Sequence, residues 1–327
     1  MFDGHYQPHI PADLGFYDLR LPEIRLAQAE MAKAHGIEGF CYWHYWFSGR
    51  RLLEMPFNEV LRRGEPDFPF CLAWANHTWL GKWFAGRKDL FNQMLIEQTY
   101  GGPKDAEKHF YFLLEAFGDE RYITVDGKPL LYLYRPNQIP EINQLADCWR
   151  ELAHRAGLKG LHLVGQGFTP KQAKKAGLDA SCRMFWPRPE DHAAFMKHRQ
   201  PTVYEYERLL PLLLKDEPLE KNDYPTLIPN WDNTPRAAHE GLVFHGASPE
   251  LFRLHVRQAV QKVAHKSPPR RLIFIRSWNE WSEGNHLEPD RRYGRGFLEV
   301  IRDEVVEINH NANEPQLNGL KKQLPTD

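Results

Sequence analysis

One segment of the sequence constrains the fold more than any other. It runs from Arg271 to Asp290 and reads RLIFIRSWNEWSEGNHLEPD. Its first part, residues 272–275, is a compact apolar run of the kind found in buried parallel strands. The rest changes abruptly to carboxylates, amides and indoles. Because α/β enzymes build their sites where buried strands end, the segment predicts a strand that leads into the chemical centre of the protein.

The remaining sequence alternates short apolar runs with helical patterns. The runs that predict strands are 37–47, 68–75, 129–134, 161–164, 180–185, 225–230 and 272–275. Helices are expected at 22–36, 50–63, 105–117, 141–156, 204–215 and 297–308, with two more opened by Thr169-Pro170 and Ser248-Pro249. In the first of these helices, the apolar face is predicted to consist of Ile24, Ala27, Met31 and Ala34.

This pattern of strands that are each followed by a helix predicts an α/β fold, a (β/α)8 TIM-type barrel. Such a barrel needs eight strands, and the pattern lacks the first one. We therefore expect an open seam between the strands at 39–47 and 272–275, covered by residues 5–10 or by self-association with a second chain. A doubly wound open sheet is the alternative, although no GxGxxG motif follows a strand.

Composition limits the classes of partner and compartment. No repeat or linker divides the chain, so we expect one barrel domain over residues 1–308 and a polar tail over 309–327. A formal net charge of −1 gives no electrostatic basis for binding nucleic acid. No apolar run approaches the roughly 18–20 residues of a membrane span. The four cysteines form no CxxC motif, which favours a cytoplasmic location.

Polar and aromatic residues gather directly after the predicted strands, where a barrel would bring them to one mouth. Indole rings stack on the apolar faces of sugars, and amides and carboxylates bind hydroxyl groups, so the expected partner is an oligo- or polysaccharide. The candidate substrate-binding residues are His44, Tyr45, Trp46, Trp74, Asn76, His77, Trp79, Tyr134, Trp186, Trp231, Asp232, Asn279, Trp281, His286 and Glu288.

Glu280 and Glu283 are the candidate catalytic residues. Glycosidic chemistry uses two carboxyl groups that flank the bond, ~5–5.5 Å apart in most retaining enzymes and ~6.5–9.5 Å apart in inverting enzymes. Two glutamates three residues apart, just beyond a strand, can face one pocket at such distances. A metal-dependent barrel hydrolase is an alternative, but the sequence has no HxH or HExxH motif. We expect no metal and no organic cofactor.

Four segments resemble one known group of proteins. They are residues 4–20 (GHYQPHIPADLGFYDLR), 36–56 (GIEGFCYWHYWFSGRRLLEMP), 68–79 (FPFCLAWANHTW) and 278–290 (WNEWSEGNHLEPD). Together they resemble the bacterial polysaccharide-biosynthesis proteins with a glycoside hydrolase family 99-like domain, also called WbsX-type glycosyltransferases. The resemblance covers nearly the whole chain and implies a (β/α)8 barrel.

The resemblance also implies an activity. It points to hydrolysis or transfer of glycosyl units in the metabolism of bacterial surface polysaccharides such as O-antigen, lipopolysaccharide or capsule. By analogy with the related endo-α-mannosidases, Glu280 would be the base that assists the substrate 2-hydroxyl, forming a 1,2-anhydro sugar. Glu283 would protonate the leaving oxygen and later activate water or an acceptor. The alternative is a non-catalytic glycan-binding or scaffolding protein.

Overall fold

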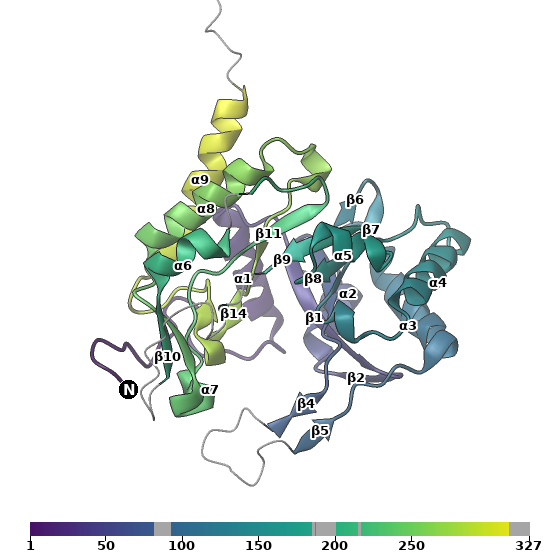
Figure 1. The fold of residues 1–327 in the computed structure, drawn as a ribbon, viewed down its shortest axis with the longest axis horizontal. Helices are drawn as coiled ribbons and strands as arrows, with labels where there is room; N and C mark the ends of the chain where they lie inside the picture. The colour runs from purple at the N-terminus through teal and green to yellow at the C-terminus, as the bar shows by residue number, and fades with distance from the viewer. Residues whose placement is uncertain (82–92, 185–186, 188–200, 215–216, 314–327) are drawn as a thin grey trace, which may run out of the picture.

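The computed structural model describes residues 1–81, 93–184, 187, 201–214 and 217–313. Its centre is a sheet of parallel strands with helices packed around it (Figure 1). The seven parallel strands are β1 (Phe40–Phe47), β3 (Phe70–Trp74), β7 (Lys128–Leu133), β8 (His162–Gln166), β9 (Ala180–Arg183), β11 (Asp223–Leu227) and β13 (Phe274–Ile275).

The order of these strands in the sheet decides between the two predicted architectures. Each parallel strand pairs with the next one along the chain, from β1 at one end to β13 at the other. A doubly wound sheet reverses its strand order at a switch point, whereas a barrel-type sheet turns in one direction throughout. The TIM-type prediction is therefore confirmed, and the doubly wound alternative is wrong.

Helices form the outer layer, and all of those named next except the first and the last lie between consecutive parallel strands. They are α1 (Pro22–Ala34), α2 (Met55–Arg63), α3 (Gly102–Phe117), α4 (Ile142–Arg155), α5 (Pro170–Lys175), α6 (Tyr206–Leu213), α8 (Pro249–Val263) and α9 (Gly296–Asn313). The two predicted caps are present: Thr169 forms a capping box with Gln172, and the Ser248 side chain accepts a hydrogen bond from the backbone of Leu251.

In the described part of the chain, β1 and β13 do not pair, so the predicted seam between them is present. The outer layer closes over it, because Met31 of α1 and the following Ile37 pack in the same apolar cluster as α8 and α9. Side chains fill part of the gap, with the rings of Phe40 and Trp278 centred 5.2 Å apart. Nearer the mouth, the antiparallel strand β2 (Arg50–Leu52) pairs with the edge of β1 that faces the seam, opposite the edge that pairs with β3.

Two local predictions are corrected. Residues 5–10 do not cover the seam; they lie against Asp232 and Asp290 at the mouth. Residues 50–52 form β2 rather than the start of a helix, because Ser48 and Gly49 adopt positive φ angles that turn the chain back on β1. Four short strand pairs also form: β10 (Thr202–Glu205) with β12 (Leu242–His245), β14 (Asn279–Glu280) with β15 (Asn285–His286), β4 (Trp79–Leu80) with β5 (Met94–Ile96), and β6 (Thr124–Val125) with β7.

The buried face of α1 also differs from the predicted one. The buried residues are Arg25, Gln28, Ala29 and Ala32, whereas Ala34 is exposed. Polar groups determine this orientation: Gln28 donates a hydrogen bond to Glu288, and Arg25 donates to the backbone carbonyl groups of Leu19 and Arg20. Buried polar groups need such partners, so they override the apolar periodicity.

Candidate active site

The two candidate catalytic glutamates lie on a small hairpin at the mouth. Beyond β13, strands β14 and β15 pair with each other, and a single turn over Trp281–Glu283 joins them. Gly284 ends this turn with φ 56°, and a side chain on it would come within 2.8 Å of the Asp232 backbone. The hairpin is therefore held closely against the loop that follows β11.

Arg236 lies between the two glutamates. Its guanidinium nitrogens are 3.3 Å from a Glu280 carboxylate oxygen and 3.2 Å from a Glu283 carboxylate oxygen. Arg236 belongs to the short helix α7 (Thr234–Ala237), which follows β11. Both carboxyl groups can reach one guanidinium, so they face a common space, as paired acid–base chemistry requires.

The environment of Glu283 favours its protonated form. Burial raises the pKa of the Glu283 carboxyl, and the nearby Glu280 carboxylate raises it further, while Arg236 and Arg276 oppose this shift. Its side chain is 14% exposed, against 35% for that of Glu280. Of the two, Glu283 has the surroundings expected of a proton donor.

Aromatic side chains form a rim on the inward face of the sheet. The Tyr45 ring lies edge-to-face against Trp79, with centroids 5.2 Å apart. The Tyr134 ring lies edge-to-face against Trp43 and against His77, with ring centroids 5.2 Å apart in both pairs. The Glu280 charge is close enough to Tyr45 to add to the effect of burial, and together they raise the Tyr45 pKa to about 12. The rim therefore reaches the carboxylates.

Behind the hairpin, Glu288 is the centre of a buried network. Its carboxylate accepts hydrogen bonds from the Tyr17 hydroxyl, the Gln28 amide and the Trp281 indole, at 2.7–3.0 Å. Asn279 donates to the same Tyr17 hydroxyl at 3.0 Å. Burial raises the pKa of Glu288, and these donors oppose that shift. Glu288 and Asn279 thus orient the hairpin.

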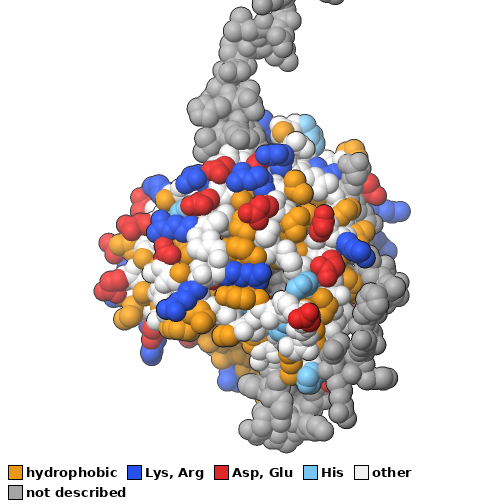
Figure 2. Space-filling model, turned by 90° about the vertical axis from the view of Figure 1, so that its left-hand side faces the viewer, with side chains coloured by type: hydrophobic (Ala, Val, Ile, Leu, Met, Phe, Trp, Pro, Cys, Tyr) orange, Lys and Arg blue, Asp and Glu red, His pale blue; other side chains and the backbone are white. Residues whose placement is uncertain are grey.

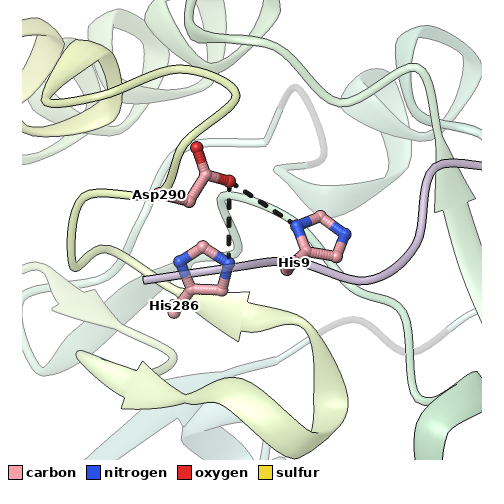
Figure 3. Close-up of side chains that lie close together, drawn as sticks. All are labelled: His9, His286 and Asp290. Carbon is pink, nitrogen blue, oxygen red and sulfur yellow. Dashed lines mark ion pairs between the residues drawn. The ribbon is translucent and has the colours of Figure 1, made fainter. Parts of the chain in front are cut away.

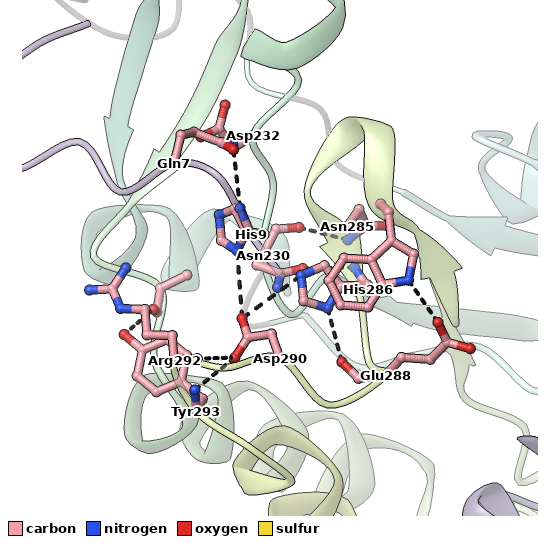
Figure 4. A network of polar contacts seen from close by, with 12 residues as sticks. Gln7, His9, Asn230, Asp232, Asn285, His286, Glu288, Asp290, Arg292 and Tyr293 are labelled. Atoms are coloured by element: carbon pink, nitrogen blue, oxygen red, sulfur yellow. Dashed lines mark hydrogen bonds and ion pairs between the residues drawn. The ribbon is translucent and has the colours of Figure 1, made fainter. Parts of the chain in front are cut away.

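Asp232 has a similar supporting position (Figure 4). One of its carboxylate oxygens accepts hydrogen bonds from His5 and Gln7, at 2.8 and 2.7 Å. The other accepts from the backbone and hydroxyl of Thr234. His286 is also buried, and its backbone donates to Asn230. Burial lowers the pKa of the His286 imidazole to about 4.

Several predicted binding residues are not brought to the mouth. His44, Trp46 and Trp74 point to the outer face of the sheet, where their rings pack against His109 of α3. Side chains alternate between the two faces of a strand, so His44 and Trp46 point away from the rim formed by their neighbours. His44 lies 2.8 Å from His109, and burial lowers its pKa to about 3.

Two more predicted residues are buried beside the mouth. Asn76 donates to the backbone carbonyl of Arg135 and accepts from the Arg135 backbone N–H, which joins the loops after β3 and β7. Trp231 packs in an apolar cluster with Tyr204 and Phe244. Trp186 lies outside the described residues.

Comparisons with known proteins show the family to which the chain belongs. Residues 1–301 match the family Glyco_tran_WbsX, glycosyltransferase WbsX. The chain belongs to the WbsX glycosyltransferase family. It is 35% identical over 323 residues to the uncharacterised protein WxcX of Xanthomonas campestris pv. campestris (strain B100). That match covers 96% of this chain and 46% of WxcX, so the chain spans about half the length of this relative.

Solved structures support the WbsX fold. A glycoside hydrolase-like protein superposes with a TM-score of 0.63 at 13% identity, covering 91% of this chain and 89% of the other. The GH99 endo-alpha-mannosidase from Bacteroides thetaiotaomicron superposes with a TM-score of 0.59 at 14% identity, covering 96% and 91%. At these identities the likeness concerns the fold. None of the helices that the structure describes combines the length and apolar character needed to cross a bilayer.

Sequence reasoning missed two arginines of the candidate site. Arg276 directly follows β13, and its guanidinium carbon lies 5.9 Å from the centroid of the Tyr134 ring. Its position at a strand end could have indicated a residue of the site. Arg236 gave no comparable signal, because it lies in the short helix α7, several residues beyond the end of β11. The surface beside the N-terminal region shows basic and acidic side chains intermingled rather than separated by charge (Figure 2).

Proposed function

We propose that this chain is a carbohydrate-active enzyme that hydrolyses or transfers glycosyl units in bacterial surface polysaccharide metabolism, on O-antigen, lipopolysaccharide or capsule. The observation that carries the proposal is the pair Glu280 and Glu283, which share one guanidinium at the mouth of a barrel-type sheet. Membership of the WbsX family supports it. The cytoplasm is the proposed compartment, in keeping with four free cysteines.

Glu283 is the proposed acid and Glu280 the proposed base. Glu280 would take the proton of the sugar 2-hydroxyl while that oxygen attacks the anomeric carbon. The bond to the leaving oxygen breaks at the same time, and Glu283 gives that oxygen its proton. Water or an acceptor hydroxyl, deprotonated by Glu283, would then open the 1,2-anhydro sugar, and Glu280 would return the proton to the 2-oxygen. The raised pKa of Glu283 supports its part in this sequence.

The aromatic rim would bind the glycan on either side of the reacting bond. Trp43 is 39% exposed, and the Trp79 and Tyr134 rings are half-buried. Exposed faces of this kind stack on the apolar faces of sugar rings. The rings lie beside carboxylates and arginines that can bind hydroxyl groups, so the surface suits a neutral polyhydroxylated substrate.

A non-catalytic glycan-binding protein is the competing proposal, because the same rim would serve it. The metal-dependent hydrolase is less well supported. His44 lies on the outer face of the sheet beside His109, while His77 contacts Tyr134 on the inner face, so they do not converge with His286.

The test is turnover of bacterial oligosaccharides, screened by mass spectrometry with and without acceptor sugars. We expect Glu280→Gln and Glu283→Gln each to abolish product formation, whereas Glu240→Gln, at an exposed glutamate close to Arg236 in sequence, retains it. Unchanged turnover in both site variants would remove the catalytic assignment. Binding of a glycan by the unmutated chain without any product would favour the binding protein.

A further inference from the structure

Two histidines and an aspartate meet beside the hairpin, outside the proposed catalytic pair (Figure 3). They are His9 of the N-terminal segment, His286 at the end of β15, and Asp290. One ligand atom from each lies within 4.8 Å of the other two. The side chains are 13%, 2% and 4% exposed, so the cluster is shielded from solvent.

The nitrogen atoms that face Asp290 lack a hydrogen-bond partner. Neither Nδ1 of His9 nor Nε2 of His286 makes a hydrogen bond within the described residues, although both atoms are buried. They lie 3.5 and 4.0 Å from the same Asp290 carboxylate oxygen. Each nitrogen therefore has only a long ion-pair contact with Asp290, and because buried polar atoms normally have closer partners, this arrangement needs an explanation.

The other ring nitrogen of His286 indicates what is missing. Its Nδ1 lies 3.0 Å from the backbone carbonyl oxygen of Glu288, which can only accept a hydrogen bond. The proton of the neutral ring is therefore on Nδ1, and Nε2 directs a lone pair towards the Asp290 carboxylate. A lone pair opposite a buried carboxylate is unfavourable unless a proton or a metal ion lies between them.

The spacing of these groups is close to that of a metal site. Zinc ligands at ~2.0–2.1 Å from the ion in tetrahedral geometry lie roughly 3.3 Å from one another. Shifts of less than about 1 Å would bring the three ligand atoms to such distances. The other oxygen of Asp290 accepts from the backbone of Arg292 and Tyr293 at 2.9 and 2.7 Å, which fixes the carboxylate.

A pocket gives an ion access to the cluster. His9 and Asp290 line it together with His5, Asp232 and His245. A water molecule in this pocket could occupy the fourth coordination position.

We propose that His9, His286 and Asp290 bind one divalent transition-metal ion, with Zn²⁺ as the best fit to two imidazoles and one carboxylate. The ion would join the N-terminal segment to the loop that follows the catalytic hairpin. Its role would be structural, because Glu280 and Glu283 are not among its ligands.

The experiment is metal titration of the chain without a polyhistidine tag, first stripped with a chelator. We expect one equivalent of Zn²⁺ to bind in calorimetry and in metal analysis, Co²⁺ to give visible d–d absorption, and the melting temperature to rise with Zn²⁺. His9→Ala and Asp290→Asn should weaken Zn²⁺ binding on the order of 100-fold or more, since even outer-shell partners of metal ligands contribute 10–100-fold. His245→Ala changes a histidine of the same pocket and should retain full affinity.

Unfolding curves in metal-free buffer show whether the variants fold. Asn can keep the backbone contacts of Asp290, so the metal-free Asp290→Asn variant should unfold like the metal-free unmutated chain. The metal-free His9→Ala variant should still unfold cooperatively but at lower stability, because it loses the ring contacts of His9 with Tyr6 and His286. The proposal is overturned if the unmutated chain binds none of Zn²⁺, Co²⁺, Ni²⁺ and Mn²⁺ stoichiometrically. It is equally overturned if both variants bind as tightly as the unmutated chain. Both readouts are independent of glycan turnover, so they do not depend on the proposed function.

Discussion

The Trp281 indole lies almost parallel to the His286 imidazole, with ring centroids 3.8 Å apart and an angle of 15° between the planes. Trp281 stands between the two candidate catalytic glutamates in sequence, and its indole N–H also donates to Glu288 at 2.7 Å. The tip of the hairpin is therefore fixed by stacking and by a hydrogen bond. Such support from buried neighbours is what a site needs to hold two carboxylates in place.

Replacing Arg236 with Gln should shift the pH dependence of turnover. Arg236 lowers the pKa of Glu283, so its removal should let that pKa rise further. An acid must be protonated to act, so activity falls as the pH rises through its pKa, and the alkaline limb of kcat/KM should move to higher pH. Arg295→Gln, at an exposed arginine paired with Asp13, should leave the limb in place. A limb that does not move in Arg236→Gln would contradict the role of Glu283 as the acid.

Trp43 and Trp46 provide a test of the two faces of β1. Trp43→Ala should raise KM for a glycan severalfold with little loss of stability, because its ring is 39% exposed at the rim. Trp46 is 6% exposed and stacks on His109, so Trp46→Ala should lower the free energy of unfolding by about 3–5 kcal/mol. Denaturant unfolding and steady-state kinetics of both variants separate these effects. If Trp46→Ala raised KM and Trp43→Ala only lowered the free energy of unfolding, the inner face would not be the one that binds the substrate.

Asp232→Asn should loosen the N-terminal segment. One Asp232 oxygen accepts hydrogen bonds from His5 and Gln7, and the other accepts from the backbone of Thr234. In Asn an NH₂ group replaces one of these oxygens and, in either orientation, faces a donor. Hydrogen exchange of residues 5–11 should become faster. Asp13→Asn is the control, because Asp13 belongs to the same segment but forms an exposed pair with Arg295, worth about 0–1 kcal/mol. Equal exchange in both variants would show that Asp232 does not hold the segment.

Glu288→Gln should destabilise the protein. The carboxylate accepts hydrogen bonds at both oxygens, and the NH₂ group of Gln would face at least one of those donors. Hydrogen bonds to charged groups contribute about 1.5–3 kcal/mol, so we expect a loss of roughly 2 kcal/mol in the free energy of unfolding. Glu299→Gln, on the exposed side of α9, should have no measurable effect. A Glu288→Gln variant as stable as the unmutated chain would show that the network contributes little.

Much of the fold could be predicted from the sequence because its signals are local. Apolar runs and helical periodicity located the seven parallel strands, and the abrupt change after residue 275 located the segment that carries Glu280 and Glu283, although not its hairpin shape. The alternation of side chains within a strand was not used in choosing binding residues. It separates Tyr45 at the rim from His44 and Trp46 on the outer face.

The remaining features depend on contacts between distant parts of the chain. Arg236 gains its position from the loop after β11, and nothing near it in the sequence indicates two carboxylates 44 and 47 residues away. The buried face of α1 depends on Gln28 reaching Glu288. Apolar periodicity cannot report a polar partner of this kind.

The contacts of Glu288 bear on the order in which the protein is made. Its partners Tyr17 and Gln28 precede it by 271 and 260 residues, so a ribosome releases them long before the carboxylate that they bind. Until the hairpin emerges, the first helix lacks the group that orients its buried polar face. The hairpin beside Glu288 can therefore be fixed only after most of the barrel has been synthesised.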